Sequence, residues 1–257
     1  MFSFLERWLK SAALEAQEYV RLLGEAVRGL LSPPLYRHDI VEQLDELGVG
    51  SLTVVLLAGL FTGAALALNS GQTLDQFGAR PVVGRLVSAS MIKELGPVLT
   101  ALMLTGRVGS GIAAELGSMV VTDQINALRA LGTDPIRKLV VPRMLSGFVM
   151  TPILTVMADF VGILGGWVVA RFTLQVNSGL YWSEVTHGLY IADTWMGIIK
   201  PFVFGFIIVT IACHVGLRTT GGTAGVGKST TMSVVVGSVA VIAADFFVTQ
   251  ILMSVLY

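Results

Sequence analysis

Five long apolar runs, separated by short polar segments, make up most of the chain. About 20 consecutive apolar residues are enough to cross the hydrocarbon core of a bilayer. Each of the five runs reaches that length, so the sequence predicts five transmembrane helices. They cover residues 49–71, 95–121, 144–170, 195–217 and 232–257.

The composition is that of a membrane protein and argues against a soluble globular protein and against a nucleic-acid-binding protein. Hydrophobic residues make up 54% of the 257 residues, charged residues only 13%, and the mean hydropathy is +0.77. These values lie far outside the range of soluble globular proteins. The formal net charge is zero, so no basic surface points to a nucleic-acid partner. We therefore expect an all-α integral membrane protein that does not bind nucleic acid.

The first 31 residues follow a different pattern from the five runs. Apolar residues recur there at three- and four-residue spacing, with charged residues between them. This pattern predicts an amphipathic helix at residues 2–31 that lies along the membrane surface, and Pro33 and Pro34 are expected to end it. A soluble-type helix packed on a partner domain is the alternative. We expect residues 1–47 to form an N-terminal interfacial region and residues 48–257 a five-span domain.

One compact polar segment, residues 121–143, separates the second run from the third. Its basic residues outnumber its acidic ones, and such an excess in a short loop marks the cytoplasmic side. The N-terminal region then lies on the cytoplasmic side and the C-terminus faces outward. Within the segment, Thr122 is expected to cap a short helix, Gly132 to close it, and Pro135 to start the next helix.

Several charged residues lie inside the apolar runs, where each isolated charge costs about 2.5–3.5 kcal/mol. Side chains of this kind must face protein or a wet cavity. Mutual ion pairing that only holds the helices together is an equally good reading for Asp159 and Asp245. Glu94 and Lys200 stand beside helix-perturbing prolines near the outer ends of their runs, so we expect them at the mouth of a cavity. The charged residues inside the runs are Arg107, Glu115, Asp159, Lys200 and Asp245.

The second run also carries small residues at four-residue spacing. Gly109, Ala113 and Gly117 would lie on one face of a helix, where a second helix backbone can approach closely. We predict that this face packs against another helix.

One motif imitates a nucleotide site. Residues 222–229 match the P-loop pattern G-x-x-x-x-G-K-S. A true P-loop follows a buried strand and opens a helix in an α/β domain, whereas this string lies between two membrane-length runs. We expect its glycines to form a tight cytoplasmic turn. Ser110 and His214 show no arrangement for nucleophilic catalysis, and the histidines lack metal-ligand spacing, so no catalytic, cofactor or metal site is predicted.

Several strings resemble the MlaE (YrbE-type) permease family, the membrane subunits of ABC systems that move phospholipids between the two membranes of Gram-negative bacteria. Three of them are ELGPVLTALMLTGR at 94–107, GSGIAAELGSM at 109–119 and TDQINALRALGTDP at 122–135. The resemblance extends into residues 216–227 and covers most of residues 40–257.

The resemblance implies a homodimer in the bacterial inner membrane that helps to maintain outer-membrane lipid asymmetry. The segment at 122–134 would be a coupling helix that docks on a separate ATPase, which would bind ATP and Mg²⁺. Further implied partners are a STAS-domain protein, a hexameric MCE-domain periplasmic protein and phospholipids. The coupling residues would be Asp123, Gln124, Ile125, Leu128, Arg129, Leu131, Gly132 and Asp134. An interfacial loop without a partner is the alternative for this segment.

The expected mechanism is mechanical, because no chemistry is assigned to this chain. Leu66, Leu68 and Leu99 would hold acyl chains in a cavity with Glu94 and Lys200 at its polar mouth. Two rival functions remain. A permease for sterols or fatty acids would share the same motifs, and a proton-coupled secondary transporter would use Asp159 and Asp245 as proton carriers.

Overall fold

The computed structural model describes residues 2–31 and 36–256, and in the first helix the side chains of Lys10 and of residues 13–30. Pro33, Pro34 and Tyr257 lie outside these ranges. Within them the chain is helical, with no strand. In chain order the helices are α1 (Phe2–Leu31), α2 (Arg37–Asp75), α3 (Val83–Ser90), α4 (Gly96–Leu104), α5 (Ser110–Val121), α6 (Gln124–Ala130), α7 (Val141–Phe172), α8 (Ser178–His187), α9 (Ile191–Leu217) and α10 (Gly222–Leu256). A 3₁₀ turn, η1 (Arg80–Val82), and three π-helical segments, η2 (Met91–Leu95), η3 (Thr105–Gly109) and η4 (Ile136–Val140), join several of them.

The prediction of five membrane-length helices is confirmed. The stretches that are long and apolar enough to cross a membrane are Arg37–Asp75, Arg80–Val121, Ile136–Phe172, Ile191–Leu217 and Gly222–Leu256. Each extends beyond its predicted bounds, because polar residues at the ends remain helical. The boundary expected at residue 47 falls inside α2, which is one continuous helix of 39 residues.

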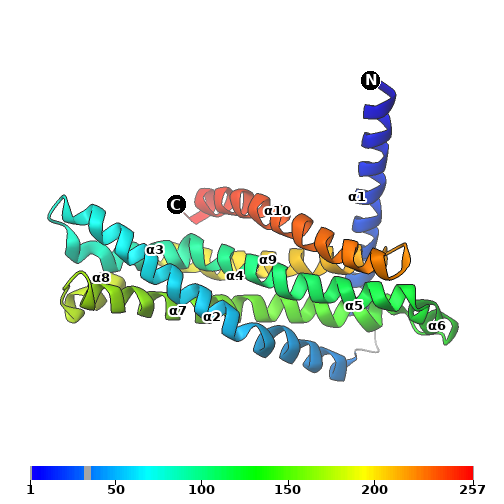
Figure 1. Ribbon diagram of the computed structural model, residues 1–257, viewed down its shortest axis with the longest axis horizontal. Coiled ribbons are helices and arrows are strands. Elements are labelled where there is room, and N and C mark those ends of the chain that lie inside the picture. Colours follow the sequence, from blue (N-terminus) through cyan, green and yellow to red (C-terminus); the bar gives the residue numbers. More distant parts are fainter. Residues whose placement is uncertain (1, 32–35, 257) are drawn as a thin grey trace.

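Helix α1 lies across the long axis of the bundle near the end that carries α6 (Figure 1). This is the orientation expected of a helix on a membrane surface. The Tyr19 hydroxyl and the Thr210 hydroxyl of α9 are 2.7 Å apart, and Arg218 forms ion pairs with Glu15 and Glu18. Leu14, like other apolar side chains of α1, stays exposed. Polar contacts and the buried Leu22 and Ala26 therefore tie α1 to the bundle, while other apolar side chains of α1 stay exposed.

The backbones of α2 and α7 touch. Gly59 and Gly63 lie one helical turn apart on α2, and a Cβ atom at Gly59 would come within 2.6 Å of the Ala158 carbonyl oxygen. A Cβ atom at Gly63 would overlap the Gly162 carbonyl. Helices in a membrane gain little from the hydrophobic effect, so close packing of small residues is what holds them together. The same buried stripe of α2 comprises Ser51, Val55, Gly59, Gly63, Ala67 and Gly71.

The small-residue face predicted on the second span lies in a different interface. Ala113 is fully buried, with the backbone of Gly216 on α9 close by. Gly109 accepts a hydrogen bond from the Ser233 hydroxyl of α10 at 3.0 Å, and Gly117 lies against Thr219. This face thus meets α9, the turn after it, and α10.

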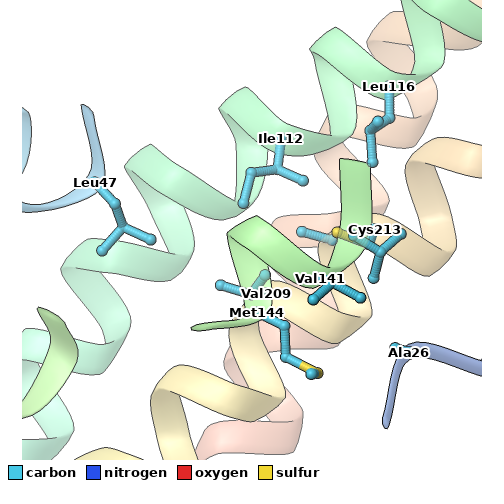
Figure 2. Packing of buried hydrophobic residues seen from close by; sticks show 10 residues of the cluster. Ala26, Leu47, Ile112, Leu116, Val141, Met144, Val209 and Cys213 are labelled. Carbon is cyan, nitrogen blue, oxygen red and sulfur yellow. The ribbon is translucent and has the colours of Figure 1, made fainter. Parts of the chain in front are cut away.

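A core cluster near the α6 end joins five of the long helices. Figure 2 shows side chains from α1, α2, α5, α7 and α9 meeting there. Cys213 is one of its fully buried members. The labelled members are Ala26, Leu47, Ile112, Leu116, Val141, Met144, Val209 and Cys213.

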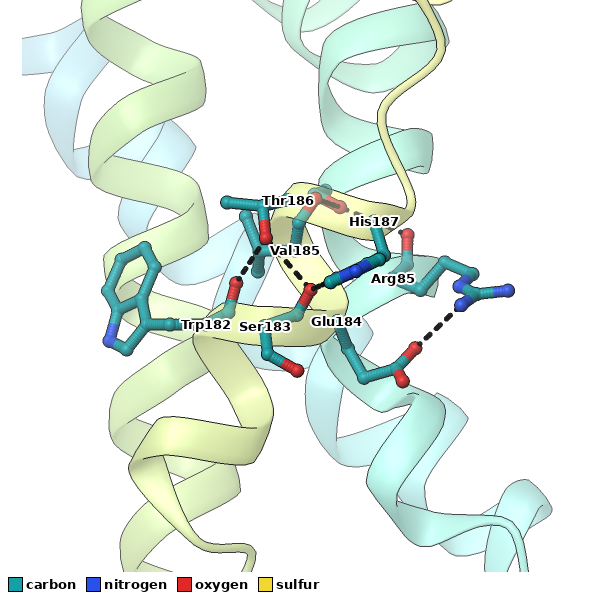
Figure 3. A network of polar contacts seen from close by, with 8 residues as sticks. Arg85, Trp182, Ser183, Glu184, Val185, Thr186 and His187 are labelled. Carbon is teal, nitrogen blue, oxygen red and sulfur yellow. Dashed lines mark hydrogen bonds and ion pairs between the residues drawn. The ribbon is translucent and has the colours of Figure 1, made fainter.

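The opposite end of the bundle is closed by α8, a helix that the hydropathy pattern did not predict. Its Tyr181 is fully buried and donates a hydrogen bond to the Ile163 carbonyl at 2.9 Å. Burial raises the pKa of the Tyr181 hydroxyl above its usual range, so it stays a donor. Figure 3 shows polar contacts of α8, where Glu184 pairs with Arg85 of α3 at 3.1 Å and the His187 ring meets the Ser183 carbonyl.

We predict that Gly63→Ala lowers the thermal unfolding temperature of the purified protein in detergent. The added methyl group would push α2 and α7 apart, and such overpacking costs about 1–3 kcal/mol. Gly111→Ala is the matched control, because nothing lies within 4 Å of a Cβ atom at that position. Equal unfolding temperatures for both variants would contradict the assigned contact.

Candidate functional site

A fully buried lysine connects three membrane helices. The Lys200 ammonium on α9 lies 2.6 Å from the Glu94 carboxylate on η2 and 3.0 Å from the Asp245 carboxylate on α10. It also donates a hydrogen bond to the Lys93 carbonyl at 3.0 Å. Glu94 remains partly exposed, with 38% of its side chain accessible. The cluster therefore surrounds a fully buried ammonium group with two partly accessible carboxylates, of which Glu94 is the more open and Asp245 is 22% exposed.

The sequence placed Glu94 and Lys200 together and left the partner of Asp245 open. The structure brings all three into one cluster. A single charge in hydrocarbon is costly, and its pairing with opposite charges inside the protein reduces that cost. Asp159 does not join them. It is 6% exposed, its Oδ1 atom has no hydrogen-bond partner among the described residues, and Gly96 leaves room for it.

The three π-helical segments all carry charged residues. Lys93 and Glu94 lie in η2, Arg107 lies in η3, and Arg137 and Lys138 lie in η4. A π-helical turn contains an extra residue, which rotates the side chains that follow it, and such turns are frequent at functional sites. No hydropathy signal distinguishes them from regular helix, which is why the sequence did not predict them.

Arg107 and Glu115 do not pair with each other. Arg107 donates a hydrogen bond to the Ser51 hydroxyl at 2.9 Å, and Glu115 pairs with Arg143 at 2.6 Å. Both line a small crevice against Gln43 and Glu46, in the first turns of α2. They thus face protein and a polar space.

The three leucines expected to hold acyl chains are not brought together within one chain. Leu66 is half-buried and packs on the core cluster near α8, and Leu99 is half-buried on α4. Leu68 is 36% exposed. None of them lines the cavities described in this section. Their proposed role therefore requires a space outside the single chain.

A groove of about 880 Å³ opens between α1, α9 and α10 near the α6 end. Its wall includes Tyr19, His214, Arg218 and Lys228 together with apolar side chains. Residues 222–229, the string that imitates a P-loop, form the start of α10 and are helical. The tight turn expected there is wrong for most of the string, since only Gly221 and Gly222 have the positive φ of a turn. The rest of the string continues as the first turns of α10.

The predicted short helix between the second and third spans is present as α6. Its N-cap is Asp123, with φ of 59°, rather than Thr122. The Thr122 hydroxyl donates to the Ser118 carbonyl at 2.8 Å and so belongs to the end of α5. Gly132, with φ of 76°, follows the C-terminus, and the Thr133 N–H reaches the Leu128 carbonyl at 3.0 Å. This is the glycine C-cap that the sequence predicted.

Helix α6 forms the tip of the bundle, on the segment that links α5 to η4 (Figure 1). Ile125 is buried against the bundle, Leu128 is half-buried, and Leu131 is 81% exposed. Ile125 thus anchors the short helix on the bundle, and Leu131, its C-cap residue, is left exposed. The other expected coupling residues are all exposed: Asp123, Gln124, Arg129, Gly132 and Asp134.

Comparison with known proteins identifies the family. The family model described as Permease MlaE matches residues 40–251, which run from α2 almost to the end of α10. The chain belongs to the MlaE permease family.

Relatives of this MlaE-family chain match it over nearly its whole length. A probable ABC transporter permease protein of Rickettsia felis is 40% identical over 230 residues, covering 90% of this chain and 89% of the relative. The intermembrane phospholipid transport system permease protein MlaE of Haemophilus influenzae is 35% identical over 243 residues, covering 91% and 93%. The chloroplastic protein trigalactosyldiacylglycerol 1 of Arabidopsis thaliana is 34% identical over 225 residues, covering 88% and 64%.

We predict that Lys200→Met destabilises the protein by about 3 kcal/mol, because it leaves two carboxylates in the membrane without their cation. The measurement is thermal unfolding in detergent. Lys228→Met makes the same chemical change at an exposed position and should have little effect. Addition of Asp245→Asn to Lys200→Met should recover part of the loss, and a Lys200→Met protein as stable as the parent would refute this reading.

Proposed function

We propose that this chain is the membrane subunit of an ABC transporter that moves phospholipids between the inner and outer membranes and so maintains outer-membrane lipid asymmetry. The observation that carries the proposal is α6, a short helix presented at the tip of the bundle with Leu131 and Arg129 exposed. The name of the Haemophilus relative, an intermembrane phospholipid transport system permease, supports the substrate.

In this proposal the chain is not an enzyme. α6 docks on a separate ATPase subunit, and that partner binds ATP and Mg²⁺. The exposed Leu131 offers an apolar anchor, and Arg129 and Asp134 offer charges around it. A small apolar centre with a polar rim is the usual anatomy of a protein interface.

The lipid would lie between two copies of the chain. α10 leaves large apolar side chains exposed in the single chain, Phe246 and Phe247 among them, and the second copy would cover part of this face. Leu66, Leu68 and Leu99 would contact acyl chains in a cavity completed by the second copy. Glu94, held by Lys200, would meet the polar headgroup at the mouth, with Asp245 fixing the lysine from the other side.

We propose the bacterial inner membrane as its location, with α1 and α6 on the cytoplasmic side and the C-terminus on the periplasmic side. α1 and α6 lie at one end of the bundle, and α10 runs from that end toward the other (Figure 1). The basic residues of the α6 to α7 segment favour the cytoplasm for that end. A STAS-domain protein would join the ATPase there, and a hexameric MCE-domain protein would sit on the periplasmic face.

Two other functions have support. The name of the Arabidopsis relative contains that of a glycolipid. Lipids other than phospholipids, with sterols and fatty acids among them, are therefore a second class of candidate substrate. A proton-coupled secondary transporter is the second candidate, because Asp159 is buried without a hydrogen bond to Oδ1. ATP-independent transport in vesicles would favour it.

The test of the proposed function is affinity purification of the tagged chain in mild detergent. We expect an ATPase to co-purify and its hydrolysis rate to rise when phospholipid is added. A chain that purifies alone would refute the ABC reading. An ATPase that responds to sterols or fatty acids and not to phospholipids would change the substrate and keep the transporter class.

Substitutions in the exposed part of α6 should weaken docking. We predict that Arg129→Glu and Leu131→Asp each reduce the co-purified ATPase at least about tenfold, as expected for loss of 1.4 kcal/mol or more at a small interface. Arg171→Glu, an exposed arginine at the opposite end of the bundle, is the matched control. Unchanged co-purification in both α6 variants would exclude α6 as the docking element.

A further inference from the structure

The segment after α6 is tied firmly to the helix that follows. The Ile136 N–H donates to the Asp134 carboxylate at 3.0 Å, and the Lys138 N–H donates to the Asp134 carbonyl at 3.1 Å. The glycine cap at Gly132 closes the other side of the turn. A displacement of α6 would therefore carry η4 with it.

Helices α1, α2 and α5 each make contact with η4 and the first turn of α7. The Lys138 ammonium lies 2.5 Å from the Asp39 carboxylate of α2. The Arg143 guanidinium lies 2.6 Å from the Glu115 carboxylate of α5. Gly29 of α1 packs on the same segment, with both Arg137 and Val141 3.1 Å from a Cβ atom placed there. The segment is thus a junction between the α6 tip and α1, α2 and α5.

The two ion pairs border a polar crevice of about 280 Å³ between the start of α2, α5 and the start of α7. Arg143 is buried and also donates to the Leu139 carbonyl at 3.0 Å, whereas half of the Glu115 side chain is accessible. Figure 1 shows the start of α2 splayed away from α5 at this end. Polar, hydrated walls permit small shifts that a tightly packed apolar interface resists.

Farther along, α2 has no such freedom. At Gly59 and Gly63 its backbone lies directly on α7. The helix is continuous for 39 residues from Arg37 to Asp75, or roughly 58 Å at 1.5 Å per residue. A displacement at Asp39 is therefore transmitted along a rigid helix that lies on α7 from Gly48 to Gly71, and its far half carries Leu66 and Leu68.

We propose that η4 acts as a relay, which transmits a displacement of α6 to α2, and that α2 carries this displacement through the membrane. Lys138 and Asp39 pass the displacement of α6 to the start of α2, and α2 moves together with α7, on which it packs from Gly48 to Gly71, so that its outer half shifts the wall of the lipid site. The ion pair between Arg143 and Glu115 connects α5 to the same segment. This inference rests on the proposed function, since it takes the docked ATPase as the source of the displacement.

The test uses the complete complex reconstituted in vesicles of phosphatidylethanolamine with a minor share of phosphatidylglycerol. We expect Asp39→Asn and Lys138→Met to lower lipid transfer per ATP hydrolysed at least about fivefold, the lower end of usual coupling effects. The amount of bound ATPase should stay the same. Asp39→Lys combined with Lys138→Asp should restore most of the transfer, because the pair is re-formed with its charges exchanged.

Glu42→Gln is the matched control. Glu42 lines the same crevice and forms no ion pair with the described residues, so its substitution should leave transfer unchanged. Full transfer in Asp39→Asn and Lys138→Met would overturn the relay, as would failure of the exchanged pair to restore it. Loss of bound ATPase in those variants would also overturn it and assign Lys138 to docking. Absence of ATPase from the parent complex would instead refute the proposed function itself.

Discussion

The backbones of α2 and α7 touch at Gly59, Gly63 and Gly162, because no side chain stands between them. Lipid tails are as apolar as leucine, so two helices in a membrane associate through close contact and not through exclusion of water. That contact sets the angle between α2 and α7. Helices α4 and α9 pack along α7, α8 joins through Tyr181 at the outer end, and α5 and α10 pack on α9.

Charges inside the bundle obey a related constraint. Lys200 is fully buried, and its position is tolerable because η2 and α10 each bring a carboxylate to within 3.0 Å of its ammonium group. Arg143 is paired with Glu115 in the same way, nearer to the α6 end. The π-helical segments orient several of these side chains, since the extra residue in each turn changes the direction in which the next residues point. The π-helical segments thus contribute to the pairing of charges inside the bundle.

The proposed transporter needs two regions with different stiffness. Toward the outer end, α8 and the glycine contact hold α2 and α7 together. Near α6, residues 37–46 of α2 border a polar crevice, and only from Leu47 onward does α2 pack in the apolar core. A displacement of α6 therefore reaches α2 at its first turns, where the packing is open. Farther along, where α2 and α7 are in close contact, the two helices move together. This division gives a membrane subunit without chemistry of its own a way to convert a partner's movement into a change in lipid-exposed surface.

Local patterns in the sequence determined the class, the five spans, the short helix α6 and its closure at Gly132, because hydropathy and capping act over a few residues. The glycine spacing on α2 was also present in the sequence, but only the fold shows that its partner is α7. Tertiary structure alone decided that Asp245 joins Lys200 while Asp159 does not, that Asp123 rather than Thr122 caps α6, and that residues 222–229 are helical. The physical reason is that charge pairing and backbone contact depend on which residues become neighbours after the chain folds, and a linear pattern carries no such distances.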